Sequence, residues 1–224
     1  MKKTKLLLVA TLFPISLFAQ EKITIMANAG MGWRTAKIPD NISSSDKDRV
    51  KKLKSGFNFD ISAYHKLGYN YGLGLKFNQY NASASGPSYI IDEDNGQVYS
   101  TNISTKDRIT FIGPSFLYSN FDEEGKHKLY YELALGLINY NSDNTVTISN
   151  NRVNMIAKGS SFGVAVSMGY NYQITPNILV GPQLAFTGGT LSKVKMNNVE
   201  EKLGSDEKEG LHRVSLGMGA TFRF

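Results

Sequence analysis

The end of the chain limits its fold most tightly, because apolar residues alternate with small or polar ones up to the last position. The apolar set is Val214, Leu216, Met218, Ala220, Phe222 and Phe224. The positions between them are Arg213, Ser215, Gly217, Gly219, Thr221 and Arg223. A period of two indicates a β-strand. A strand that stays apolar on one face up to the terminal carboxylate indicates that this face meets lipid while the other lines a barrel.

The same alternation recurs about eight times along the chain. We expect strands near residues 22–34, 54–65, 69–81, 112–118, 128–141, 161–173 and 180–186, followed by the terminal one. Spans of about ten residues fit tilted transmembrane strands. The sequence therefore predicts an all-β fold, an eight-stranded antiparallel up-and-down transmembrane β-barrel. A ten-stranded barrel is the competing interpretation, and polar alternates such as Asp92, Ser100 and Asn102 argue against burying a further strand pair in lipid.

Two of the expected strands share a Gly-Pro pair, at Pro114 and at Pro182. Proline cannot donate to a β-ladder, so we expect a bulge or bend at each position. The phase of the strand around Pro114 stays open, because its apolar side chains fall on both faces. They are Ile109 and Phe111 on one face and Ile112 and Phe116 on the other.

Short and long connections alternate along the chain. Short turns are expected near residues 66–68, 120–127 and 174–176, and long loops near 35–53, 82–106, 142–159 and 188–209. Short periplasmic turns and long extracellular loops are typical of outer-membrane barrels. A three-residue turn ending in a left-handed Gly68 would place Phe59 opposite Leu75. We expect residues 88–102 and 145–156 to form two protruding ribbons with exposed strand edges.

Residues 1–19 have the pattern of a secretory signal peptide, which leaves residues 20–224 as the barrel domain. Lys2, Lys3 and Lys5 precede an apolar run that is too short for a membrane helix and contains Pro14. Removing this segment lowers the formal charge from +6 to +3, because three of the 25 basic residues lie in it. The basic balance therefore does not indicate nucleic acid. The chain has no cysteine, so stability must come from closing the barrel rather than from disulfides.

The charged residues expected to face the barrel interior are Arg213 and four that we interpret as candidates for a polar plug. Asp60 and Lys76 fall on diagonal positions of paired strands, whereas Glu132 and Arg223 fall near the periplasmic end. Such a set could serve as a proton or ion path. The structural interpretation is a polar plug, since eight strands leave room only for side chains and buried charges persist as pairs.

The sequence contains no pattern of catalytic, cofactor-binding or metal-binding residues. The three histidines are not joined to a nucleophile by any compact motif, and the acidic turns lack the ligand spacing of a calcium loop. One loop is strongly basic, which suggests contact with lipopolysaccharide phosphates or with an acidic partner, or only a solvated loop. Its basic residues are Lys47, Arg49, Lys51, Lys52 and Lys54.

The terminal pattern of Gly219, Phe222 and Phe224 resembles the signal that the bacterial barrel-assembly machinery recognises. Together with the strand count and loop asymmetry, the whole mature chain resembles the small outer-membrane β-barrel family, including OmpX- and Ail-like proteins. The resemblance implies a monomeric, non-enzymatic surface protein of the bacterial outer membrane whose extracellular hairpins contact other molecules. A narrow channel or small-molecule carrier is the alternative. An enzyme that modifies lipid A is less favoured.

Overall fold

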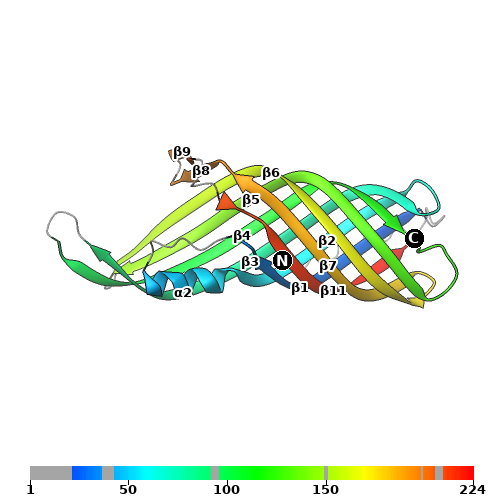
Figure 1. Ribbon diagram of the computed structural model, residues 1–224, viewed down its shortest axis with the longest axis horizontal. Coiled ribbons are helices and arrows are strands. Elements are labelled where there is room, and N and C mark those ends of the chain that lie inside the picture. Colours follow the sequence, from blue (N-terminus) through cyan, green and yellow to red (C-terminus); the bar gives the residue numbers. More distant parts are fainter. Residues whose placement is uncertain (1–21, 37–42, 92–95, 149–150, 198, 205–208) are drawn as a thin grey trace, which may run out of the picture.

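Eight antiparallel strands close into a barrel in the computed structural model, which describes residues 22–36, 43–91, 96–148, 151–197, 199–204 and 209–224 (Figure 1). The barrel strands are β1 (Ile23–Arg34), β2 (Ser55–Lys66), β3 (Tyr71–Ile91), β4 (Val98–Ser119), β5 (His127–Ile148), β6 (Asn151–Thr175), β7 (Ile178–Leu191) and β11 (Arg213–Arg223). Neighbours in the chain pair with each other, β7 also pairs with β11, and β11 pairs with β1. The predicted fold and strand number are confirmed. The predicted signal peptide lies outside the described residues.

The strands present an apolar outer face and a more polar inner face, as the alternation predicted. Leu73 and Leu75 of β3 and Leu133 of β5 are each at least half exposed on the outer face. The same physical rule resolves the phase of β4. Ile109 and Phe111 are fully buried inside, whereas Ile112 and Phe116 lie outside.

Strands β3 to β6 are 21 to 25 residues long, about twice what a bilayer requires. The β3–β4 pairing reaches Ile91 and Val98, and the β5–β6 pairing reaches Ile148 and Asn151. The β4–β5 pairing continues to Asn102 and Thr147. The two predicted ribbons therefore join into one four-stranded sheet beyond the barrel, at the left of Figure 1. We call residues 82–91, 98–107, 142–148 and 151–157 of this sheet the extension.

The expected bulges at the prolines are wrong. Pro114 lies opposite Leu75 and Pro182 opposite Met218, each in an unbroken register. On the other side of Pro114, the β4–β5 pairing omits two positions and resumes in the same register. Both strands thus tolerate the missing N–H by omitting ladder contacts rather than by adding a residue. Among the described strand pairs, a register shift occurs between β6 and β7 at residues 173–175.

The register predicted for β2 and β3 is also wrong. Phe59 lies opposite Gln79, not Leu75, because the connection is residues 67–70 rather than a three-residue turn. The backbone N–H of Leu67 donates to the carbonyl of Tyr71 at 2.9 Å. Gly68 is not among the described glycines with positive φ. The offset from the predicted register is four residues, an even number, so outward side chains still meet outward side chains.

A helix that the sequence analysis missed, α2 (Ser44–Leu53), lies in the first long loop. Ser43 caps it by accepting the N–H of Asp46 at 3.1 Å. Leu53 is buried against the inner face of β3, and Tyr80 donates to its carbonyl at 2.9 Å. This helix is too short and too polar to cross a bilayer, and it is the one helix that the described residues contain. The last long loop holds the short strands β8 (Lys193–Met196), β9 (Val199–Lys202) and β10 (Glu209–Gly210).

Candidate functional site

Three layers of side chains fill the barrel. The layer nearest the short turns, at the end that we call periplasmic, is mainly apolar. Its apolar residues are Met26, Tyr64, Leu117, Phe121, Tyr130 and Leu179, all at most 4% exposed. The buried side chain of Asn171 donates to Thr221 at 2.9 Å beside Leu179. The layer nearest the extension is also apolar. It includes Tyr80, Ile109, Phe111, Ile138, Leu191 and Leu211. Because both ends of the interior are closed by packed side chains, charged groups between them are shielded from water.

The central layer is built around Lys76. Its Nζ lies 2.7 Å from Oδ2 of Asp60 and 2.8 Å from Oε2 of Glu132. All three side chains are at most 1% exposed. The sequence analysis predicted the diagonal pairing of Asp60 with Lys76, and the structure brings them together. It did not anticipate Glu132 as the second partner of Lys76.

Glu132 is the acceptor on which most of the central layer converges. Ser62 donates to Oε1 at 2.8 Å, Tyr64 to Oε1 at 2.5 Å, and Gln183 to Oε2 at 3.1 Å. These donors come from β2 and β7, so the carboxylate ties together distant parts of the ring. A buried carboxylate that accepts several hydrogen bonds and one ion pair suits a fixed structural plug better than a mobile proton carrier.

Arg213 lies at the extracellular edge of the central layer. It donates through Nη2 to Oδ1 of Asn78 and lies over the Tyr80 ring at 6.0 Å. Asn78 in turn donates to Oδ1 of Asn58 at 3.1 Å. These inward amides appeared in the sequence only as polar positions of the alternation, and their partners depend on how the barrel curves.

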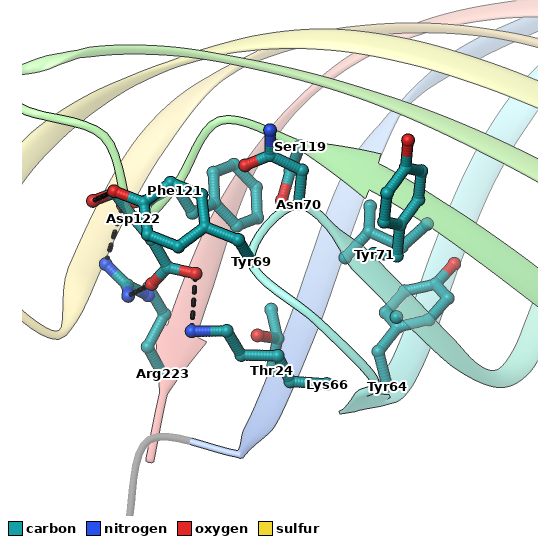
Figure 2. Close-up of a pocket in the computed structure, with 12 residues that line it drawn as sticks. Thr24, Tyr64, Lys66, Tyr69, Asn70, Tyr71, Ser119, Phe121, Asp122 and Arg223 are labelled. Carbon is teal, nitrogen blue, oxygen red and sulfur yellow. Dashed lines mark hydrogen bonds and ion pairs between the residues drawn. The ribbon is translucent and has the colours of Figure 1, made fainter.

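The turn between β4 and β5 closes the periplasmic end. Phe121 packs edge-on against Tyr130 with ring centroids 5.9 Å apart. Figure 2 shows Asp122 between Arg223 and Lys66. The Lys66 Nζ lies 2.5 Å from Asp122, and Tyr69 donates to the Asp122 carbonyl at 2.9 Å.

Arg223 therefore does not join Glu132 in the central layer. It pairs with Asp122 and also donates to the carbonyl of Phe121 at 2.9 Å. The small pocket around these groups measures about 20 Å³, too little space for an organic ligand. The end of the last strand thus fastens the β4–β5 turn over the barrel mouth. Asp122 was noticed in the sequence only as part of an acidic turn.

At the extracellular mouth, a cavity of about 320 Å³ lies beneath α2. Arg34, Arg49, Asp107 and Tyr140 contribute to its lining. Arg34 pairs with Asp107 at 3.1 Å, and Tyr140 donates to the same carboxylate at 3.3 Å. Leu53, which belongs to the apolar layer nearest the extension, lines this cavity, so that layer separates the cavity from the central layer of the barrel.

The predicted basic residues Lys47, Arg49, Lys51, Lys52 and Lys54 lie on α2 or directly after it. Arg49 pairs with Asp46 at 2.8 Å, and Lys51 lies 3.7 Å from Asp48. Because α2 packs on the inner face of the extension, Arg49 and Lys54 line the mouth cavity, while Lys51 and Lys52 are exposed to solvent.

The predicted assembly signal lies in β11 and at the chain end. Gly219 faces inward beside Asn28, where a Cβ would lie 1.8 Å from the amide oxygen. Phe222 lies on the outer face. The backbone of Phe224 exchanges hydrogen bonds of 2.9 and 3.0 Å with Ile23, which seals the last strand to the first.

The histidines lie apart from one another. His127 interacts with the hydroxyl of Tyr170, and His212 stacks on Phe186 with ring centroids 6.2 Å apart. The described residues hold no cluster of three or more metal-ligating side chains. His65 lies next to the last residue of β2, His127 begins β5, and His212 directly precedes β11.

The closed ring, its apolar belt and its asymmetric connections define an outer-membrane β-barrel protein. A comparison with protein-family models finds no match, and a sequence comparison with curated proteins finds none either. Solved structures do match. A major outer membrane protein from Thermus thermophilus is 13% identical, with 90% of this chain and 99% of that one covered and a TM-score of 0.50.

Two further structures show the same kind of likeness at lower scores. Neisserial surface protein A is 19% identical, with 90% and 97% of the two chains covered and a TM-score of 0.42. The attachment invasion locus protein Ail of Yersinia pestis, in complex with the heparin analogue sucrose octasulfate, is 12% identical, with 91% and 97% covered and a TM-score of 0.44. At these identities the likeness concerns the fold, which is that of the small outer-membrane β-barrel proteins.

Proposed function

We propose that the protein is a non-enzymatic surface protein of the outer membrane, whose barrel anchors an extracellular extension that binds a partner. The observation that carries this proposal is the length of β3 to β6, which gives an ordered sheet beyond any membrane. An ordered sheet that contributes nothing to spanning the bilayer is expected to serve contact with other molecules.

The edge of β6 is the best candidate for that contact. The facing edges of β4 and β5 pair with each other up to Asn102 and Thr147, which excludes them from binding a further strand. The other edge of β6 is occupied by β8 from Ala157, and Ile156 donates to the side chain of Asn197 at 3.1 Å. Residues 151–155 lie beyond these contacts, and their Val153 and Met155 are exposed. A partner strand could add here by β-augmentation.

The basic residues of α2 supply a second contact surface. Their position over the mouth cavity favours an acidic soluble partner over membrane lipid. Lys51 and Lys52 lie in the last helical turn and are exposed. Exposed charges of this kind act mainly by steering a partner of opposite charge.

The closed interior argues against the channel alternative. Ion conduction needs a continuous wet path, and two apolar layers interrupt it on either side of the ion pairs. The separation of the histidines likewise gives no support to a lipid A-modifying enzyme. We propose further that residues 1–19 direct export, that the chain inserts as a monomer, and that Gly219, Phe222 and Phe224 engage the barrel-assembly machinery.

Shortening the extension tests the proposal. One variant replaces residues 85–104 with Asn-Gly and another replaces residues 145–154 with Asn-Gly, which leaves Ala84 opposite Thr105 and Asn144 opposite Met155. Asn-Gly suits a two-residue hairpin. Adherence of bacteria displaying each variant to host-cell monolayers is compared at equal surface display. We expect the second variant to lose most adherence because it removes the β6 edge. Full adherence by both variants would refute the proposal.

A further inference from the structure

A second cavity lies on the outer wall of the barrel, between β5, β6 and the β8–β9 hairpin. It measures about 430 Å³ and is lined by Lys158, Lys193, Lys195, Asn141, Ser160 and Glu200, among others. We call it the hairpin cavity. Figure 1 shows β8 and β9 beside β6, which β8 joins at residues 157 and 158. The sequence analysis identified this segment only as part of a long loop, residues 188–209.

Strand pairing gathers the charged groups on one face. Lys158 of β6 lies opposite Lys195 of β8, and Lys195 lies opposite Glu200 of β9. Residues directly opposite each other in a ladder share a face of the sheet. Even-numbered positions of β6, such as Val166 and Met168, form its lipid-facing side. The lysines therefore face outward, on the same side as the apolar belt.

The height of the cavity matches the level of lipid headgroups. Leu137 lies opposite Phe162, and both are strongly exposed at the upper edge of the apolar belt. The next outward positions are Asn139 and Ser160, which both line the cavity. Two residues along a strand span about 7 Å. The cavity thus begins directly above the level at which hydrocarbon contact ends.

Charge in the cavity favours an anion. Three lysines face one carboxylate, that of Glu200, which lies 2.9 Å from Lys193. The hydrogen bond from Lys193 holds the pKa of Glu200 below its ordinary value, so this carboxylate is charged at neutral pH. Glu200 competes with any bound anion for Lys193.

We propose that the hairpin cavity binds the phosphorylated sugar headgroup of an outer-leaflet glycolipid. Lysine ammonium groups are phosphate binders. The side chains of Asn139, Asn141 and Ser160 can hydrogen-bond sugar hydroxyls. A headgroup whose acyl chains lie along Leu137 and Phe162 would place its phosphate among the lysines. This site lies on the outer wall and is separate from the α2 surface, so it does not depend on partner binding by the extension.

Native mass spectrometry on the full barrel tests this assignment. The protein is released from nanodiscs of phosphatidylcholine that contain a small fraction of bisphosphorylated lipid A. At a lipid A fraction at which only a small part of the wild-type protein retains one lipid A molecule, we expect the triple variant Lys158→Gln/Lys193→Gln/Lys195→Gln to retain at least tenfold less. The matched control is Lys106→Gln, which removes an outward lysine paired across the ladder with Asp143. Equal retention by wild type and the triple variant, or equal loss in the control, would overturn the proposal.

A variant that is expected to retain more lipid A tests the proposal even if the triple variant misfolds. Glu200→Gln removes the competing carboxylate, so we expect it to increase retention about threefold while the barrel stays folded. Dephosphorylated lipid A should be retained poorly by wild type. Soluble glucosamine bisphosphate at equal molar concentration should displace little lipid A, because the acyl chains contribute to binding. Unchanged retention in Glu200→Gln would contradict the proposal, and full displacement by the soluble sugar phosphate would show that the cavity takes a free sugar phosphate rather than a lipid.

Discussion

Lys76 of β3 donates to Glu132 of β5 at 2.8 Å, although β4 lies between their strands. The contact crosses the lumen rather than following the ladder. Lys76 also holds Asp60, so one cation serves two buried carboxylates. An arrangement of this kind is stable only while all three side chains remain, because each charged group is desolvated and needs its partner.

Replacing Lys76 with methionine is therefore expected to destabilise the barrel strongly. The change preserves side-chain length but leaves Asp60 and Glu132 buried without their cation. Breaking a buried ion pair in this way costs about 3–5 kcal/mol. Urea unfolding in lipid vesicles, followed by the gel mobility of unheated samples, measures the loss.

A triple variant provides the control for this experiment. Asp60→Asn/Lys76→Met/Glu132→Gln removes all three charges while keeping side-chain volume, so we expect it to be more stable than Lys76→Met alone. If the triple variant is less stable than Lys76→Met, the unpaired carboxylates of Asp60 and Glu132 stabilise the layer, which contradicts the desolvation argument.

The sequence predicted those parts of the fold that depend on local alternation. Strand positions, the facing of every strand except β4, and the diagonal pair of Asp60 and Lys76 follow from a period of two and from neighbouring strands. The contact between Lys76 and Glu132 does not, because it depends on the curvature of the closed ring. The same holds for Arg223, whose partner Asp122 lies on a turn that folds under the barrel.

Local chemistry explains the other misses. The Ser43 cap and Asp46 in the first helical turn indicate α2, but the sequence analysis interpreted this lysine-rich segment as a loop. The prolines were expected to lie at a bulge or bend. Pro114 and Pro182 face outward without a bulge, and the ladder omits contacts there and resumes in register.

Phe121→Ala is expected to loosen the periplasmic closure. Phe121 is 4% exposed and fills the lower apolar layer beside Tyr130. Truncating a buried phenylalanine costs about 3–5 kcal/mol. Hydrogen exchange should show faster exchange in residues 119–129 than in wild type. Exchange that is unchanged there would show that Lys66 and Arg223 alone hold the turn.

Neither wild type nor Phe121→Ala should conduct ions. In both proteins the upper apolar layer and the Lys76 ion pairs still block the lumen. Recordings in planar bilayers should show no reproducible unitary steps, with a known porin as the positive control. Steps in wild type would revive the channel alternative, whereas steps in Phe121→Ala alone would locate the barrier at the periplasmic turn.

Ser43→Ala should fray α2 without affecting the barrel. The serine accepts the backbone N–H of Asp46, and loss of such a cap costs about 1 kcal/mol of helix stability. Asp46 also accepts a hydrogen bond from Ser88 at 3.2 Å, so the helix should partly detach from β3. Hydrogen exchange within residues 44–53 measures the effect, and the barrel strands serve as the internal reference. Increased exchange throughout the barrel would mean that α2 stabilises the whole fold.

The last residue is expected to act in assembly more than in stability. Phe224→Ala keeps the backbone hydrogen bonds with Ile23 but removes the terminal aromatic side chain. We expect it to lower the amount of folded barrel recovered from the outer membrane severalfold, while the purified variant refolded in detergent unfolds at nearly the same urea concentration as wild type. Deleting Phe224 removes the backbone contacts too and should reduce both quantities. If Phe224→Ala lowers the stability of the refolded protein as much as its recovery, the aromatic side chain serves the fold, and recognition by the assembly machinery is not needed to explain it.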